Sequence, residues 1–133
     1  MREIKFRGLL QSGVFIYGSY VTDDKDYHAI LRENPADSSE MLNTPVIPDT
    51  VGQFTGLQDK NGVNVYEGDL IKNKTGRICE VVFNDYCAAF DSEVKVDGGR
   101  SAEAYGFKNS LWKTNVTIIG NIHQHSELLE QVK

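Results

Sequence analysis

The stretch TVGQFTGLQDKNGVNVYEGDLI, residues 50–71, places strong turn chemistry between two apolar runs and constrains the fold more than any other part of the chain. Asn61-Gly62 favours a hairpin turn, because both residue types accept positive φ at low cost. Gly68-Asp69 follows, where glycine permits a sharp turn and the carboxylate can accept a nearby backbone N–H. The segment therefore predicts a hairpin and then entry into a further strand. The predicted structural turn residues are Gly52, Gly56, Asn61, Gly62, Gly68 and Asp69.

Further strands are predicted on both sides of this hairpin. EIKFRGLL and VFIYGSYV flank Gln11-Ser12-Gly13 and predict an N-terminal hairpin. The later runs GRICEVVFND, CAAFDSEVKVD and VTIIGNI predict short strands, which together suggest an open barrel or a strongly bent sheet. SELLEQVK predicts a short terminal helix that Ser126 caps.

Three segments have weaker patterns. DYHAILRE fits either a strand or a single helical turn, and both stay open. The prolines and small polar residues between Asn34 and Asp49 predict a long loop, which is either a contact surface or a passive crossover. GGRSAEAYGFKNSLW predicts a loop followed by a short helix.

The length and the charge narrow the class of protein. A chain of 133 residues fits a single domain, 1–133, with subregions at 1–49, 50–123 and 124–133. It contains neither the run of about 20 apolar residues that spans a bilayer nor the apolar core of a signal peptide, so we expect a cytoplasmic protein that does not bind membranes. The net charge of -5 is the wrong sign for long-range attraction to nucleic acid, which would need a local basic patch.

Three blocks closely resemble the YopX family of phage and prophage proteins: MREIKFR, VIPDTVGQFTGLQDKNGVNVYEGDLI and VTIIGNIHQHSELL. They occur in the family's order and span nearly the whole chain. The family commonly has Asn-Pro-Glu-Leu-Leu where this sequence has His125-Ser126-Glu127-Leu128-Leu129. The resemblance implies a phage-derived protein without an established biochemical role, and it brings no catalytic residues.

The Gly-Asp element of the central block resembles the entry into a barrel strand of SH3-like modules. The expected fold class is therefore mostly β with minor α. It comprises an N-terminal β-hairpin region, a small open SH3-like barrel and a short C-terminal helix.

Neither a metal site nor a catalytic site is expected. Cys79, Cys87, His123 and His125 lack a Cys-x-x-Cys knuckle, which indicates reduced, at least half-buried thiols and surface histidines. The carboxylates are best explained as turn caps and solvated rims, and no nucleophile triad, phosphate loop or dinucleotide fingerprint is present. We therefore expect no cofactor and no enzyme activity. The carboxylates are Glu67, Asp69, Asp85, Asp91 and Glu93.

Two groups of side chains are candidates for binding. Aromatic residues near predicted loops could form a stacking or peptide-binding groove, although a domain of this size also needs such residues in its core. They are Tyr86, Phe90, Tyr105, Phe107 and Trp112. A basic turn could contact phosphate. Its residues are Lys72, Lys74 and Arg77, with Arg100 and Lys108 as additions.

The leading functional hypothesis is a non-enzymatic binding or assembly module in the host cytoplasm, with a phage or host protein as partner. Sheet edges around the first hairpin would suit strand addition between copies of the chain, giving a homo-oligomer. The alternative is a single-stranded nucleic-acid-binding protein that uses the loop aromatics and the basic turn. An enzyme would require a pocket that joins Glu67 or Asp69 to other polar groups.

Overall fold

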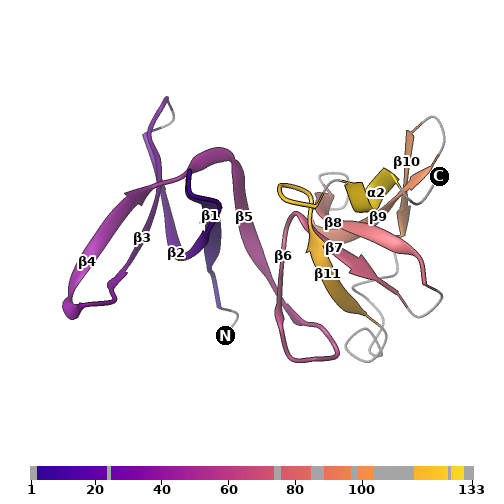
Figure 1. Cartoon of the computed structure of the whole chain (residues 1–133), viewed down its shortest axis with the longest axis horizontal. Coiled ribbons are helices and arrows are strands. Elements are labelled where there is room, and N and C mark those ends of the chain that lie inside the picture. Colours follow the sequence, from indigo (N-terminus) through magenta and orange to yellow (C-terminus); the bar gives the residue numbers. More distant parts are fainter. Residues whose placement is uncertain are drawn as a thin grey trace. The chain divides into compact units, whose positions relative to one another are not determined.

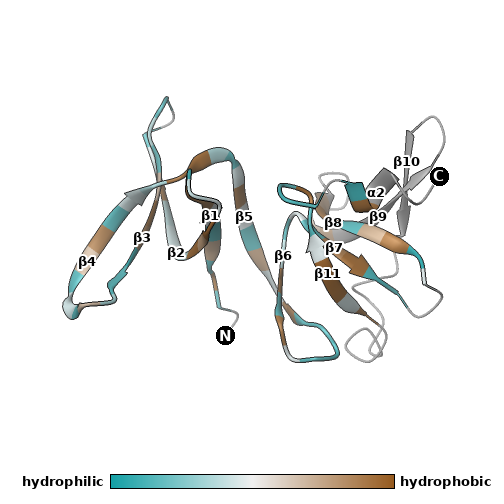
Figure 2. Ribbon diagram, in the orientation of Figure 1, coloured by the Kyte–Doolittle hydropathy of each residue, from teal (hydrophilic) through white to brown (hydrophobic). Residues whose placement is uncertain are grey.

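The computed structural model describes residues 3–23, 25–73, 76–84, 89–96, 99–103, 116–125 and 127–130. The protein is mostly β, with two antiparallel sheets (Figure 1). The chain divides into two compact units, Met1–Phe54 and Thr55–Lys133. Figure 2 shows apolar and polar residues alternating along many of the strands.

The first unit is an antiparallel sheet in which the strands follow the order β4-β3-β2-β1-β5. The segment that fitted either a strand or a helical turn forms β3, which pairs with β2 on one side and β4 on the other. The strands are β1 (Phe6–Leu9), β2 (Phe15–Thr22), β3 (His28–Asn34), β4 (Asp37–Pro45) and β5 (Ile47–Gln58), whose last residues belong to the second unit.

The loop predicted from Asn34 to Asp49 is not present, because this segment forms β4 and the start of β5. The prediction of a loop was based on the prolines of this segment, and these prolines are compatible with the observed strands. Pro35 lies in the turn between β3 and β4, and Pro45 is the last residue of β4. Proline is compatible with an edge strand wherever its nitrogen faces away from the neighbouring strand.

The N-terminal hairpin forms as predicted. The N–H of Leu10 donates to the carbonyl of Val14 at 2.9 Å, and Gly13 in the turn has a φ of 89°. However, β1 lies between β2 and β5, and β2 lies between β1 and β3. The expectation of an exposed sheet edge at this hairpin is therefore wrong, because the strands at the two ends of this sheet's order are β4 and β6 (Asn64–Tyr66).

An apolar cluster holds this sheet together. Ile16, Ile30 and Val46 are its buried members. Gly8 lies so close to Val46 that a Cβ added to it would come within 2.7 Å of the Val46 side chain. Since real Cβ atoms do not approach that closely, glycine is needed at this position for packing rather than for a turn.

The second unit contains a sheet of order β10-β9-β8-β7-β11 and the hairpin of β5 with β6. Part of the segment predicted to be a loop, residues 99–103, forms β10. Among the described residues, no strand pair closes the sheet into a barrel. The elements are β6 (Asn64–Tyr66), β7 (Asp69–Lys72), β8 (Ile78–Asn84), β9 (Ala89–Val96), β10 (Gly99–Glu103), β11 (Thr117–Asn121) and a single helical turn, α2 (Glu127–Glu130).

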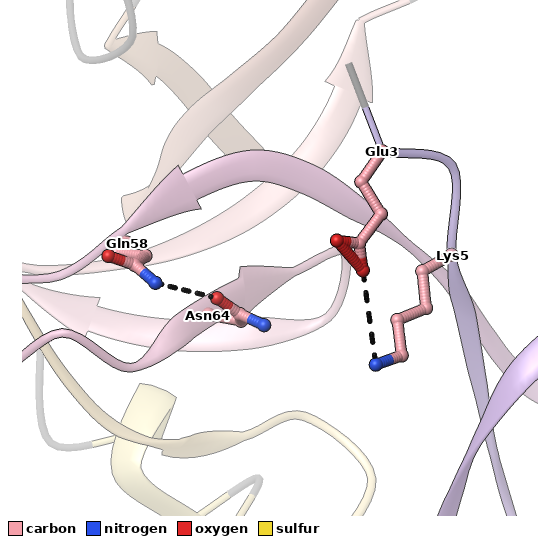
Figure 3. Close-up of polar contacts among 4 residues, drawn as sticks. All are labelled: Glu3, Lys5, Gln58 and Asn64. Carbon is pink, nitrogen blue, oxygen red and sulfur yellow. Dashed lines mark hydrogen bonds and ion pairs between the residues drawn. The ribbon is translucent and has the colours of Figure 1, made fainter. Parts of the chain in front are cut away.

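The central hairpin joins β5 to β6. Asp59 N–H donates to the Val63 carbonyl at 2.9 Å, so three residues, Lys60–Gly62, form the connection. Gly62 has a φ of 79°, as a three-residue hairpin loop with a left-handed last residue requires. Outside the turn, Gln58 Nε2 donates to Asn64 Oδ1 at 3.1 Å (Figure 3). Figure 3 also shows an exposed pair, Glu3 with Lys5 at 4.0 Å, which contributes little to stability.

The Asp59 carboxylate ties this hairpin to the rest of the second unit. Its Oδ1 accepts the N–H of Asn61 at 2.8 Å and that of Val63 at 3.0 Å. Its Oδ2 accepts the N–H of Ile118, in β11, at 3.0 Å. Asp59 is only 4% exposed, so these three backbone donors replace the water that the carboxylate loses on burial.

Replacing Gly62 with valine should cost about 1 to 2 kcal/mol of unfolding free energy, because a β-branched residue is strained at positive φ. The matched variant is Gly62→Asn, since asparagine tolerates this conformation. No atom lies within 4 Å of an added Cβ, so the comparison isolates backbone strain. Denaturant unfolding measures both variants, and equal stabilities would contradict the turn geometry.

Replacing Asp59 with asparagine should lower the unfolding free energy by about 1 to 3 kcal/mol, since the amide NH₂ cannot accept a backbone N–H. Asp59→Ala, which removes both acceptors, should cost more. Asp49 is an exposed residue of β5, and Asp49→Asn is the control, expected to stay within about 0.5 kcal/mol of wild type. Thermal melts in which Asp59→Asn and Asp49→Asn lower the melting temperature equally would refute the role of Asp59.

Candidate interaction site: the outer edge of strand β4

The backbone of β4 offers hydrogen-bonding groups on its outer side. The register of β3 with β4 is regular from Ala29↔Pro45 to Glu33↔Met41, and the N–H of Val46 donates to the His28 carbonyl at 3.0 Å. In an antiparallel ladder, residue pairs alternate between bonded and non-bonded. Thr44 and Leu42 therefore bond to β3, while the backbone groups of Asn43 and Met41 point away from it.

Both ends of this outer edge are blocked. The Ser39 N–H donates to Asp37 Oδ1 at 3.0 Å, and Pro45 has no N–H. The Ser39 hydroxyl also donates to Asp37 Oδ1 at 2.7 Å, and these two bonds hold the pKa of the Asp37 carboxyl below its usual value. Between the blocked ends, Met41 and Asn43 each present an outward N–H and an outward carbonyl. We call residues Met41–Asn43 the β4 edge.

The β4 edge can take an added strand. No strand pairs with the outer side of β4 within the part of the chain that the structure describes. The Met41 side chain is 56% exposed, and that of Asn43 is also exposed. Sequence reasoning named the segment from Asn34 to Asp49 as a candidate contact surface but missed its strand, because the prolines indicated a loop. The one local signal for a strand was the group of β-branched residues Thr44, Val46 and Ile47.

The predicted turn residues occupy several kinds of position. Gly56, Gly62 and Gly68 have positive φ, at 86°, 79° and 89°. Asp69 is buried, and its Oδ2 accepts the N–H of Tyr66 at 2.8 Å. Asn61 lies in the hairpin connection, whereas Gly52 lies within β5, opposite Arg7, and not in a turn.

The structure describes one of the five candidate aromatics. Phe90 is half-buried and lies across from Phe83, with the ring centroids 5.3 Å apart in an edge-to-face arrangement. Sequence reasoning did not single out Phe83, which is 42% exposed. The other candidates lie outside the described residues, and they are Tyr86, Tyr105, Phe107 and Trp112.

The basic turn lies between β7 and β8. Lys72 and Arg77 are exposed, and the N–H of Asn73 donates to the Arg77 carbonyl at 2.9 Å. Arg77 directly precedes β8, whereas Phe83 is near its far end, so the structure does not bring the basic turn and the aromatic pair together. Lys74, Lys108 and the side chain of Arg100 lie outside the described residues.

The histidines are half-buried, which corrects the expectation that they lie on the surface. They belong to a turn after β11, where His125 Nδ1 accepts the N–H of Asn121 at 3.1 Å. His123 Nε2 would come within 3.1 Å of a Cβ placed on Gly68. Cys79 is buried and does not form a disulfide, while Cys87 lies outside the described residues.

Of the remaining candidate carboxylates, the structure describes the side chain of Glu67. Glu67 is half-buried near Asp69 in the turn before β7. Asp85 and the side chains of Asp91 and Glu93 lie outside the described residues. In the described ranges, His, Cys, Asp and Glu form no group of three or more that could hold a metal ion, and no helix there is long and apolar enough to cross a membrane.

These features define a mostly β protein with an available edge strand. A family model described as YopX protein matches residues 5–130, and the chain belongs to the YopX family. The crystal structure of protein EF1440 from Enterococcus faecalis is similar at 20% sequence identity and a TM-score of 0.49. That similarity covers 97% of this chain and 99% of the other. A search of curated proteins found no match.

Two proline variants test the direction of the β4 backbone groups. Asn43→Pro removes an outward N–H, so the unfolding free energy should fall by less than about 1 kcal/mol. Thr44→Pro removes an N–H that bonds to β3 and should cost on the order of 2 kcal/mol or more. Denaturant unfolding of the two variants distinguishes the positions. Equal losses, or a larger loss at Asn43, would contradict the deduced geometry.

Proposed function

We propose that this YopX family protein is a non-enzymatic binding or assembly module of phage or prophage origin that works in the host cytoplasm. It captures a protein partner by strand addition at the β4 edge. The observation that carries the proposal is the pair of outward N–H and carbonyl groups on Met41 and Asn43, deduced from the register with β3. In strand addition, main-chain hydrogen bonds supply affinity and alternate side chains supply specificity.

The blocked ends support this function. An unprotected edge strand pairs indiscriminately, and proteins therefore shorten or interrupt such edges. Here the Ser39 N–H already donates to the Asp37 carboxylate, and Pro45 has no N–H to offer an added strand. The accessible edge is thus limited to a short window, which favours one defined register over open-ended aggregation.

For the second unit we propose an open SH3-like barrel. Strands β7 to β10 follow one another as neighbours, and β11 returns to lie beside β7. A last strand that returns to the first is what a small barrel requires. Such a barrel is a second surface on which the protein could hold its partner.

A second candidate function is binding of single-stranded nucleic acid. The observation that favours it is the partly exposed Phe83, stacked edge-to-face on Phe90, because aromatic rings on a sheet can stack on bases. The exposed Lys72 and Arg77 precede the same strand. Such binding must be strongest at low salt, so labelled single-stranded DNA and RNA that fail to bind there would eliminate it.

A pull-down from phage-infected host lysate, with and without nuclease, tests the leading proposal. Tagged wild type and Asn43→Ala, which keeps the backbone N–H, should recover the same protein by mass spectrometry. Asn43→Pro, which lacks that N–H, should lose it. Equal recovery by the proline and alanine variants would refute capture at the β4 edge. Recovery that depends on nucleic acid would favour the second candidate instead.

A further inference from the structure

We propose that the partner of the β4 edge is the β4 edge of a second copy of this chain. The two strands pair antiparallel about a twofold axis at Leu42 and form a symmetric dimer. This inference rests on the proposed function, because it uses the same edge and names its occupant. In a twofold interface, each contact that one copy makes is repeated by the other.

The backbone groups select this register. With Leu42 opposite Leu42 of the second copy, Met41 lies opposite Asn43, and the same pair recurs across the axis. Both residues present an outward N–H and an outward carbonyl, as the register with β3 indicates. Each of the four N–H groups then has an acceptor, and each of the four carbonyls has a donor. The edge is self-complementary at this one position of the axis.

Sliding the second copy by two residues breaks the match. In one direction Asn43 faces Ser39, whose N–H is already held by Asp37 at 3.0 Å, so the Asn43 carbonyl lacks a donor. In the other direction Met41 faces Pro45, which has no N–H, so the Met41 carbonyl lacks one. The two blocked ends therefore favour the register in which no outward carbonyl of Met41 or Asn43 lacks a donor, and they also limit the length of the edge.

Side chains favour the same register. Leu42 is half-buried on the apolar side of the sheet, and the axis places two such leucines side by side. Glu40 lies opposite Thr44 of the second copy, so no charge faces a like charge along the paired strands. Moving the axis to Glu40 would place the two Glu40 carboxylates opposite each other, which is unfavourable.

Cross-linking tests this pairing. The two Leu42 positions form a non-hydrogen-bonded pair, for which Cα atoms lie about 4.5 Å apart, within the range that a disulfide spans. Leu42→Cys should therefore form a covalent dimer under mild oxidation. The matched control is Thr44→Cys, whose two copies are separated by four residues of register, or roughly 13 Å, and should not cross-link. Covalent dimer formation by the wild-type protein under the same conditions measures the background from Cys79 and Cys87.

Sedimentation of the unmodified dimer provides the second measurement. Wild type and Asn43→Ala should show a mass that rises towards the dimer with concentration, while Asn43→Pro should remain a monomer. Wild type that stays monomeric from micromolar to millimolar concentration, or Leu42→Cys that cross-links no better than Thr44→Cys, would overturn the dimer.

If a monomeric wild type still captured a protein in a manner that depends on the Asn43 N–H, only this inference would fall. Capture that does not depend on that N–H would refute the proposed function.

Discussion

The second unit depends on one buried carboxylate. Asp59 accepts the backbone N–H of Asn61 in the loop of the central hairpin, that of Val63 directly after this loop, and that of Ile118 in β11, which is far away in sequence. A buried carboxylate without such donors would be very costly, so the hairpin and β11 must come together if Asp59 is to be buried at all. The Lys60 N–H, which donates to the Val116 carbonyl at 3.0 Å, lies next to this contact and adds to it.

The residues that carry the family resemblance serve the fold. Thr50 Oγ1 accepts the Leu9 N–H at 2.9 Å and donates to the Ile47 carbonyl at 2.6 Å, where the register of β1 with β5 shifts. Thr55 Oγ1 donates to the Val65 carbonyl at 2.8 Å. Many residues of the central block therefore form hydrogen bonds to backbone N–H and carbonyl groups at bulges and turns. Its chemistry explains the architecture, and the function has to be sought at a surface.

Sequence reasoning predicted the elements whose signals are local. Turn residues between apolar runs gave the first hairpin, the central hairpin and the strand entry at Asp69, because glycine and aspartate act on their own neighbourhood. It failed between Asn34 and Asp49, where pairing with β3 overrides a composition that opposes strands. The half-buried state of His125 was equally inaccessible, because it depends on the close approach of Gly120. For the first of these reasons, sequence reasoning named the segment of the β4 edge as a candidate contact surface without recognising it as a strand.

Amide hydrogen exchange in β4, followed residue by residue by NMR, tests the central claim most directly. The claim is that β4 is a paired strand whose outer side is open only at Met41 and Asn43. In dilute protein, Leu42 and Thr44 should exchange slowly, since they bond to β3, while Met41 and Asn43 should exchange fast. Uniformly fast exchange from 39 to 44 would show a loop after all. Uniformly slow exchange in a confirmed monomer would show that the outer edge is already covered.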